Sequence, residues 1–171
     1  MVKNTVNGNK GYSLIIAIIA LNLFTIMLLI AKPLWDTVLQ RDLEKELIFR
    51  GKSYVRAIQN YIKKNHNKYP ENLIVLYEKK FIRRPYKDPM SEEGKWNIVM
   101  RYKYGNTKTL LIVPEFLYQK YKQKANIVGI ASSSPDAGFM VYRGKKRYDE
   151  WAFYIGAKEN QDMPELKFVV E

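Results

Sequence analysis

Few side chains in this sequence have the type and spacing that a catalytic site needs. The single histidine, His66, stands between two asparagines at the polar end of a predicted helix, where we expect it to meet solvent. The absence of cysteine excludes thiolate catalysis, disulfides and cysteine-bound zinc. Serines 132–134 precede Pro135 without a G-x-S-x-G pattern, so they predict a turn. We therefore expect no enzyme activity.

The acidic residues of the last third are the other group that could do chemistry. Calcium takes about six to eight oxygen ligands, many of them from carboxylates. The candidates here are Asp136, Asp149, Glu150, Glu159, Asp162 and Glu165. They are scattered and lack the spacing of an EF-hand loop. We expect no cofactor and no metal, and calcium bound by these acids stays open as the alternative.

Positive charge is concentrated in the middle of the sequence. Residues 50–124 hold eighteen Lys and Arg against six Asp and Glu, whereas the segments on either side are nearly balanced. Such a surface attracts anionic lipid, nucleic acid or an acidic protein face. An ordinary basic, solvated surface is the alternative. We expect protein partners rather than nucleic acid.

A membrane anchor is predicted near the start of the sequence. Residues 12–31 are twenty residues without a charge. A helix rises about 1.5 Å per residue, so this run covers about 30 Å, the thickness of a bilayer's hydrocarbon core. The run is longer than the apolar part of a cleaved secretory signal, and no A-x-A site follows it. Basic residues flank both ends in similar number, so charge alone leaves the orientation open.

The residues at the start of this run resemble the processing site of a known family. Lys10-Gly11-Tyr12-Ser13 is similar to the prepilin peptidase site of type IV pilin-like proteins, which include the pseudopilins of type II secretion systems. Pro33 stands twenty-two residues after Gly11, where that family commonly has a helix-kinking proline. The resemblance implies cleavage between Gly11 and Tyr12 and N-methylation of Tyr12. A plain signal-anchored protein is the alternative.

One position departs from the family's pattern. Pilin-like subunits usually carry a glutamate four residues after the new N-terminus, where it pairs with the amine of a neighbouring subunit. Ile16 occupies that position, and no acidic residue precedes Asp36. In secretion pseudopili this loss is a feature of the minor subunit at the tip. The resemblance therefore implies a minor subunit.

After Pro33 the apolar residues recur at three- and four-residue steps, as on one face of a helix. We expect one helix from about Tyr12 to Asn65, kinked at Pro33, with Glu44 and other charged residues on the polar face. The glycine within the apolar stripe, Gly51, predicts a close approach of the sheet. The stripe consists of Leu34, Val38, Leu39, Leu43, Leu47, Gly51, Tyr54, Val55, Ile58, Tyr61 and Ile62.

The next segment extends the resemblance to about residue 100. Tyr69-Pro70, two following leucines and the stretch from Phe81 to Pro89 are similar to the loop after the helix in major secretion pseudopilins. Residues 71–80 predict a short surface helix within it. Alternating residues 96–104 predict a strand, Gly105-Asn106 a hairpin turn and residues 107–113 the returning strand. Residues 126–131 predict a further strand, residues 132–138 a loop, and residues 139–142 a strand paired with 150–155.

These elements predict an α+β, pilin-like fold in which a long N-terminal helix packs on an antiparallel sheet of four or five strands. We expect a leader at 1–11, a transmembrane helix half at 12–33 and an extracytoplasmic domain at 34–171. That domain divides into helix 34–65, loop 66–95 and sheet 96–171.

The resemblance implies a subunit of a type II secretion pseudopilus, anchored in the bacterial inner membrane with its domain in the periplasm. Its implied partners are other pseudopilin subunits, prepilin peptidase and the inner-membrane secretion platform. A minor type IV pilin that binds DNA through residues 50–124 is the alternative.

Overall fold

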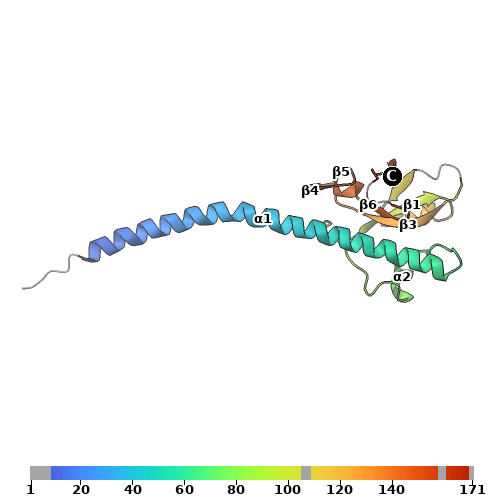
Figure 1. Ribbon diagram of the computed structural model, residues 1–171, viewed down its shortest axis with the longest axis horizontal. Coiled ribbons are helices and arrows are strands. Elements are labelled where there is room, and N and C mark those ends of the chain that lie inside the picture. The colour runs from blue at the N-terminus through green and yellow to red at the C-terminus, as the bar shows by residue number, and fades with distance from the viewer. Residues whose placement is uncertain (1–8, 105–108, 158–160, 170–171) are drawn as a thin grey trace, which may run out of the picture. The chain divides into compact units, whose positions relative to one another are not determined.

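The computed structural model describes residues 9–104, 109–157 and 161–169 (Figure 1). Its first element is the helix α1, Asn9–Lys64. The chain divides into two compact units, Met1–Gln40 and Arg41–Glu171, and we describe each by itself. The helix predicted from Tyr12 to Asn65 is confirmed. Position 33 lies within α1, and the kink at Pro33 stays a prediction.

The second unit contains a five-stranded sheet with the strand order β6-β3-β1-β2-β7. β1 pairs antiparallel with β2 and β3, β3 pairs antiparallel with β6, and β7 pairs parallel with β2. The strands are β1 (Trp96–Tyr102), β2 (Leu110–Val113), β3 (Ala125–Ser132), β6 (Ala152–Tyr154) and β7 (Leu166–Phe168). The fold therefore combines an apolar N-terminal helix with a mainly antiparallel sheet, as the α+β prediction requires. The turn predicted at residues 105–106 lies outside the described residues.

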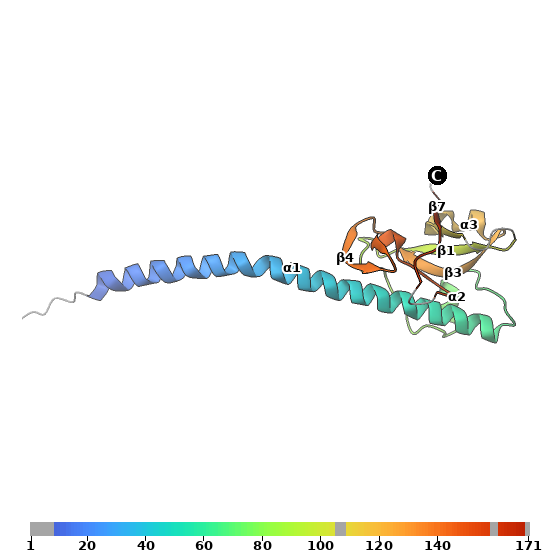
Figure 2. The same ribbon diagram turned by 45° about the horizontal axis from the view of Figure 1, so that its top comes forward.

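The strand prediction for residues 139–155 is wrong in its pairing. β4 (Ala137–Tyr142) pairs with β5 (Lys145–Arg147) in a separate two-stranded sheet. Arg143 and Gly144 have φ values of 50° and 78°, which is the backbone of a two-residue hairpin turn that reverses the chain at once. Residues 152–154 are therefore free to pair with β3. Figure 2 shows β4 beyond the end of the main sheet.

Short helices lie in the connections between the main elements. α2 (Ile74–Glu78) lies within the predicted range 71–80, and α3 (Tyr118–Tyr121) precedes β3. Two 3₁₀ turns complete the elements, η1 (Glu115–Leu117) and η2 (Tyr148–Glu150). α2 is fixed by Leu76, which is fully buried.

The part of α1 from Arg41 onward lies against one face of the sheet (Figure 1). The apolar stripe predicted for residues 47–62 faces the core, with Leu47 and Ile58 at 0% exposure and Val55 and Ile62 half-buried at its edge. They pack in one cluster with Met100, Ile130 and other sheet residues. A Cβ added to Gly51 would lie 2.4 Å from the ring of Phe153 on β6, so the predicted close approach at this glycine is confirmed.

The opposite face of the sheet has a smaller apolar cluster. Val99, Leu110 and Ile112 are buried there, and Met163 before β7 and Leu166 at the start of β7 pack against them. The sheet therefore has apolar residues on both faces, and β1 departs from simple alternation with three consecutive buried residues at its centre.

Candidate functional site

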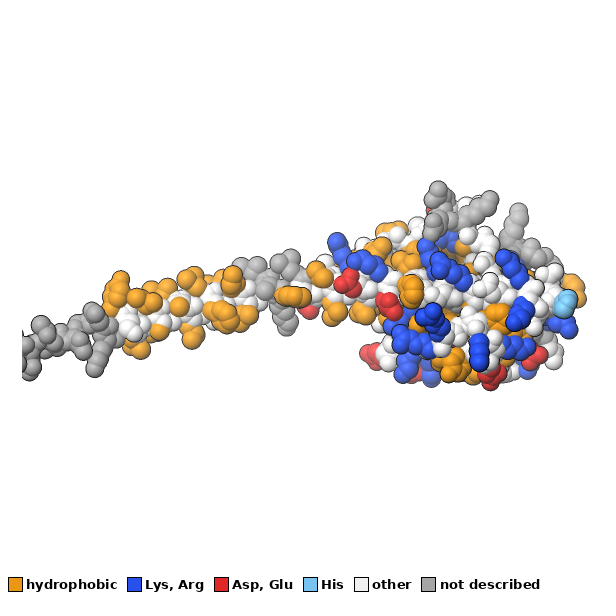
Figure 3. All heavy atoms as spheres, turned by 60° about the horizontal axis from the view of Figure 1, so that its bottom comes forward, with side chains coloured by type: hydrophobic (Ala, Val, Ile, Leu, Met, Phe, Trp, Pro, Cys, Tyr) orange, Lys and Arg blue, Asp and Glu red, His pale blue; other side chains and the backbone are white. Residues whose placement is uncertain are grey.

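The N-terminal apolar segment is the one element long and apolar enough to span a membrane among the described residues. Tyr12–Leu29 has a mean hydropathy of 2.4, and no part of it is buried within the protein. Figure 3 shows apolar side chains on the visible faces of this segment. Tyr12 is 70% exposed and Ile16 is 52% exposed. Apolar side chains left uncovered on every side need lipid or neighbouring helices around them.

The structure places the predicted processing residues at the start of α1. Gly11 and Tyr12 lie in its first turn, Ile16 lies one turn further on, and position 33 lies well inside the helix. These residues share one helix rather than a pocket.

Glu44 is a buried structural side chain whose position the sequence pattern predicted wrongly. We expected it on the polar face of the helix, yet it is fully buried, whereas Leu43 beside it is 36% exposed. Its carboxylate accepts hydrogen bonds from Phe139 N at 2.6 Å, Met140 N at 3.1 Å and the Tyr148 hydroxyl at 2.7 Å. The first two donors belong to β4, so Glu44 fixes the β4–β5 hairpin to α1.

The neighbouring glycine shows how the carboxylate reaches β4. A Cβ at Gly138 would lie 2.7 Å from Oε1 of Glu44 and 2.8 Å from the Tyr148 ring. Only glycine leaves room for both groups. The backbone N–H groups that follow it can then donate to the carboxylate. A carboxylate buried with three donors is satisfied without a positive partner.

Asp88 ties the loop before the sheet to β3. Its carboxylate accepts hydrogen bonds from the Ser132 hydroxyl at 2.7 Å and from the backbone N–H groups of Ser133 and Met90. Burial raises the pKa of Asp88, and these hydrogen bonds oppose the rise. Ser132 is thus part of β3 and holds a structural contact. The loop predicted at 132–138 is shorter, because β3 ends at Ser132 and β4 begins at Ala137.

A basic loop, residues 79–87, lies on the surface between α2 and the sheet. Tyr86 O accepts hydrogen bonds from Trp96 Nε1 at 2.8 Å and the Tyr54 hydroxyl at 3.2 Å. Arg50 donates to Lys87 O at 2.7 Å. The five cations of the loop itself are exposed, namely Lys79, Lys80, Arg83, Arg84 and Lys87. Figure 3 shows Lys and Arg side chains gathered on this face.

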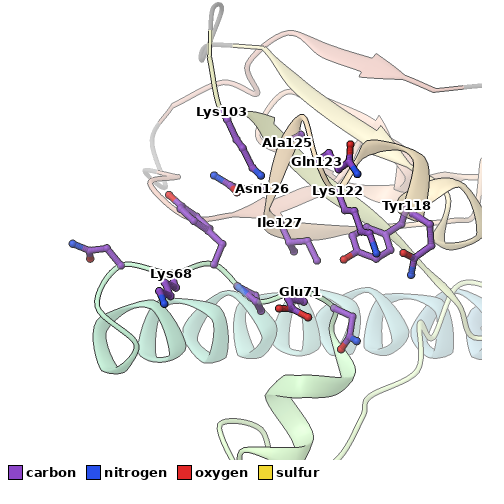
Figure 4. Close-up of a pocket in the computed structure, with 14 residues that line it drawn as sticks. Lys68, Glu71, Lys103, Tyr118, Lys122, Gln123, Ala125, Asn126 and Ile127 are labelled. Atoms are coloured by element: carbon purple, nitrogen blue, oxygen red, sulfur yellow. The ribbon is translucent and has the colours of Figure 1, made fainter.

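A groove of about 690 Å³ opens where α1 ends (Figure 4). The helix stops because His66 and Asn67 adopt positive φ, and Asn67 N donates to Ile62 O in the pattern of a Schellman cap. One wall is the chain that follows, residues 67–72. The other wall comes from the end of β1, α3 and the start of β3. His66 does not line this groove.

Four of the C-terminal acids have separate protein partners. Asp149 pairs with Arg147, Glu150 pairs with Lys145 at 2.9 Å, and Glu165 accepts a hydrogen bond from Thr109. Asp136 bonds Ser134. Glu159 lies outside the described residues. Within the described ranges no three acids or histidines come together in a way that could hold a metal ion.

Comparison of this chain with protein-family models, curated proteins and solved structures gives no match.

Proposed function

We propose that this chain is a minor structural subunit of a type II secretion pseudopilus. It is anchored in the bacterial inner membrane, carries its domain in the periplasm, and assembles with other pseudopilin subunits through α1. The observation that carries the proposal is the exposed apolar segment Tyr12–Leu29 behind a prepilin-like junction at Gly11. Prepilin peptidase and the inner-membrane secretion platform are the further partners. The role is structural rather than catalytic.

Ile16 supports a minor rather than a bulk role. After cleavage, the amine of Tyr12 would be buried in a filament core, and burying an unpaired charge costs several kcal/mol even after relaxation. A carboxylate at position 16 of a neighbouring copy would offset that cost, but this sequence has isoleucine there. Long homopolymers would repeat the unpaired amine at every step. A subunit present in few copies beside a glutamate-bearing one avoids this repetition.

Mass spectrometry of the mature protein tests the processing step. In cells that contain the peptidase we expect Tyr12 at the N-terminus with a methyl group on its amine. Gly11→Val should block cleavage because the protease must approach the backbone at this residue closely. Gly11→Ala is the matched control and should be processed nearly normally. An intact Met1 start in wild-type protein would contradict the proposal.

Stoichiometry of purified assemblies tests the minor role. We expect few copies of this chain per filament, cross-linked to a different subunit. The wild-type chain should assemble without the substitution Ile16→Glu, because a minor subunit does not need a carboxylate at this position. Long filaments of the wild-type chain alone would contradict the minor role and leave the processing result untouched.

A minor pilin that binds DNA is a second candidate, favoured by the five exposed cations of the basic loop. Phosphate contacts make affinity fall steeply with salt. Binding of a DNA duplex by the full chain in nanodiscs should then weaken with salt and with the double variant Arg83→Gln, Arg84→Gln. Equal affinity of this variant and the wild type would exclude the basic loop as the contact surface.

A further inference from the structure

The groove beyond α1 has a lining unlike an ordinary apolar ligand pocket. Its volume of about 690 Å³ lies within the range of about 300–1,000 Å³ typical of small-molecule sites. Polar side chains dominate its walls. The amide-bearing residues of the lining are Asn67, Asn72, Gln119, Gln123 and Asn126. Such a lining suits a ligand covered with hydroxyl groups, because each amide can donate and accept at once.

Most of these amides are available to a ligand. Asn72 Oδ1 already accepts a hydrogen bond from Val75 N at the start of α2. The side chains of Gln119, Gln123 and Asn126 make no hydrogen bond with another residue in the part of the chain that the structure describes. Asn126 is half-buried at the base of the sheet wall. Its amide is open to solvent and can bond a ligand that enters the groove.

Two tyrosines add aromatic and donor surface to the groove. Tyr69 is 38% exposed on the helix-side wall. Tyr118 is largely buried on the opposite wall, and burial together with the nearby Glu71 carboxylate raises the pKa of its phenol. The phenol therefore stays protonated and able to donate at neutral and mildly alkaline pH.

The charges of the groove are mixed, with an excess of cations. Lys68 and Glu71 belong to one wall, and Lys103 and Lys122 belong to the other. Figure 4 shows Lys103 extending from the end of β1 toward the opening of the groove, with Glu71 across from it. Three ammonium groups favour an anionic ligand, such as one that carries carboxylates. The single carboxylate, Glu71, accepts hydrogen bonds from hydroxyl groups.

We propose that this groove binds a segment of an acidic polysaccharide, with the amides and Glu71 on its hydroxyl groups, Tyr69 against a sugar face, and Lys103 and Lys122 on its carboxylates. The glycan of a cell wall and a uronic acid polymer are two sources of this chemistry, since both present hydroxyls and carboxylates along one chain. This inference concerns a ligand of the globular unit and does not depend on how α1 assembles.

Calorimetric titration of the full chain in phosphatidylcholine nanodiscs tests the proposal, because these discs carry neither sugar nor net charge. The probes are soluble peptidoglycan strands, oligogalacturonate, a neutral chitooligosaccharide and a DNA duplex. We expect at least one acidic glycan to bind about tenfold more tightly than the neutral one, as two exposed charge contacts would give. Which acidic glycan binds identifies the source of the ligand.

Variants separate the groove from the general positive charge of the protein. Lys103→Gln with Lys122→Gln should lower affinity for the acidic glycan about tenfold and leave the neutral one unchanged. Tyr69→Ala should weaken both sugars alike. Lys120→Gln is the matched control, because Lys120 belongs to α3 with the same charge but does not line the groove.

Several results would overturn the proposal. If the protein bound neutral and acidic glycans with equal affinity, the lysines would have no role in recognition. Tighter binding of the DNA duplex than of both acidic glycans would assign the surface to nucleic acid instead. An equal loss with Lys120→Gln would show a non-specific charge effect, and the absence of binding by both acidic glycans at millimolar concentration would show that the groove takes no such ligand.

Discussion

Replacing Glu44 with glutamine removes one of the two acceptor oxygens that hold the β4–β5 hairpin on α1. Oε1 accepts from both Phe139 N and the Tyr148 hydroxyl, and Oε2 accepts from Met140 N. A glutamine keeps the shape, but its NH₂ group must face one of these donors. The substitution therefore changes the hydrogen bonding of a fully buried group with little change of volume.

The cost follows from the donors left without an acceptor. A buried donor without a partner costs about 1–3 kcal/mol, and hydrogen bonds to charged groups contribute about 1.5–3 kcal/mol. The neutral amide is easier to bury than a carboxylate, which offsets part of the loss. We expect Glu44→Gln to lower the free energy of unfolding by about 2 kcal/mol. Tyr148→Phe should cost about 1 kcal/mol, because it removes one donor and leaves two.

Urea unfolding of the full chain in detergent, followed by tryptophan fluorescence, measures these changes. Hydrogen exchange locates them, since the amides of Phe139 and Met140 should lose protection while those of β1 keep it. Asp42→Asn is the control, because that carboxylate lies on the same helix but pairs with Lys45 at the surface. It should change stability by less than about 0.5 kcal/mol. Full stability and unchanged protection of Phe139 in Glu44→Gln would refute the reasoning.

Three further changes test other parts of the globular unit. Ile58→Ala should cost about 2–5 kcal/mol in urea unfolding, because the side chain is fully buried between α1 and the sheet; an unchanged midpoint would contradict this packing. The raised pKa of Asp88 means that the folded state holds its proton to higher pH than the unfolded state, so stability should fall as pH rises from 3.8 through the folded value and then level off. Asp88→Asn should flatten that part of the pH profile. A profile unchanged by the substitution would contradict the assignment of this pH dependence to Asp88. Burial raises the pKa of Tyr54 to about 12, so stability should fall as pH rises above 10, where unfolded tyrosine ionises first. The ultraviolet difference titration between wild type and Tyr54→Phe should show one phenol with a midpoint near 12, and a midpoint near 10 would contradict the burial.

The parts of the fold that sequence predicts well are those set by local periodicity. Three- and four-residue spacing predicted the buried face of α1 from Leu47 to Tyr61, because the side chains of that face pack in an apolar cluster with the sheet. Alternation predicted β1, and the apolar run predicted β3. Gly51 predicted a close approach of the sheet, because a glycine inside an apolar stripe leaves space that a neighbouring element fills, and the structure has Phe153 of β6 there.

The failures involve partners that are distant in sequence. Glu44 looks like a surface residue until the donors of β4, about ninety-five residues away, are brought to it. The pairing of β6 with β3 rather than β4 depends on a two-residue turn at Arg143 and Gly144 whose left-handed backbone the composition did not specify. β7 is three residues long and adds to the sheet in parallel, so it has no local pattern to reveal it. The groove beyond α1 is likewise formed by three separate segments.

The seven-residue spacing between Glu44 and Gly51 has a consequence for how this sequence can change during evolution. Both residues contact strands. The carboxylate of Glu44 accepts a hydrogen bond from β4, and the backbone of Gly51 packs against Phe153. An α-helix turns about 100° per residue, so a single insertion or deletion between them would swing one contact away from its partner. Substitutions can be absorbed at exposed positions in this stretch, but changes of length cannot. The loop of residues 79–87 faces solvent on one side and can vary in length. We expect homologous sequences to keep the Glu-x₆-Gly interval without gaps, even where the residues of that loop have diverged beyond alignment.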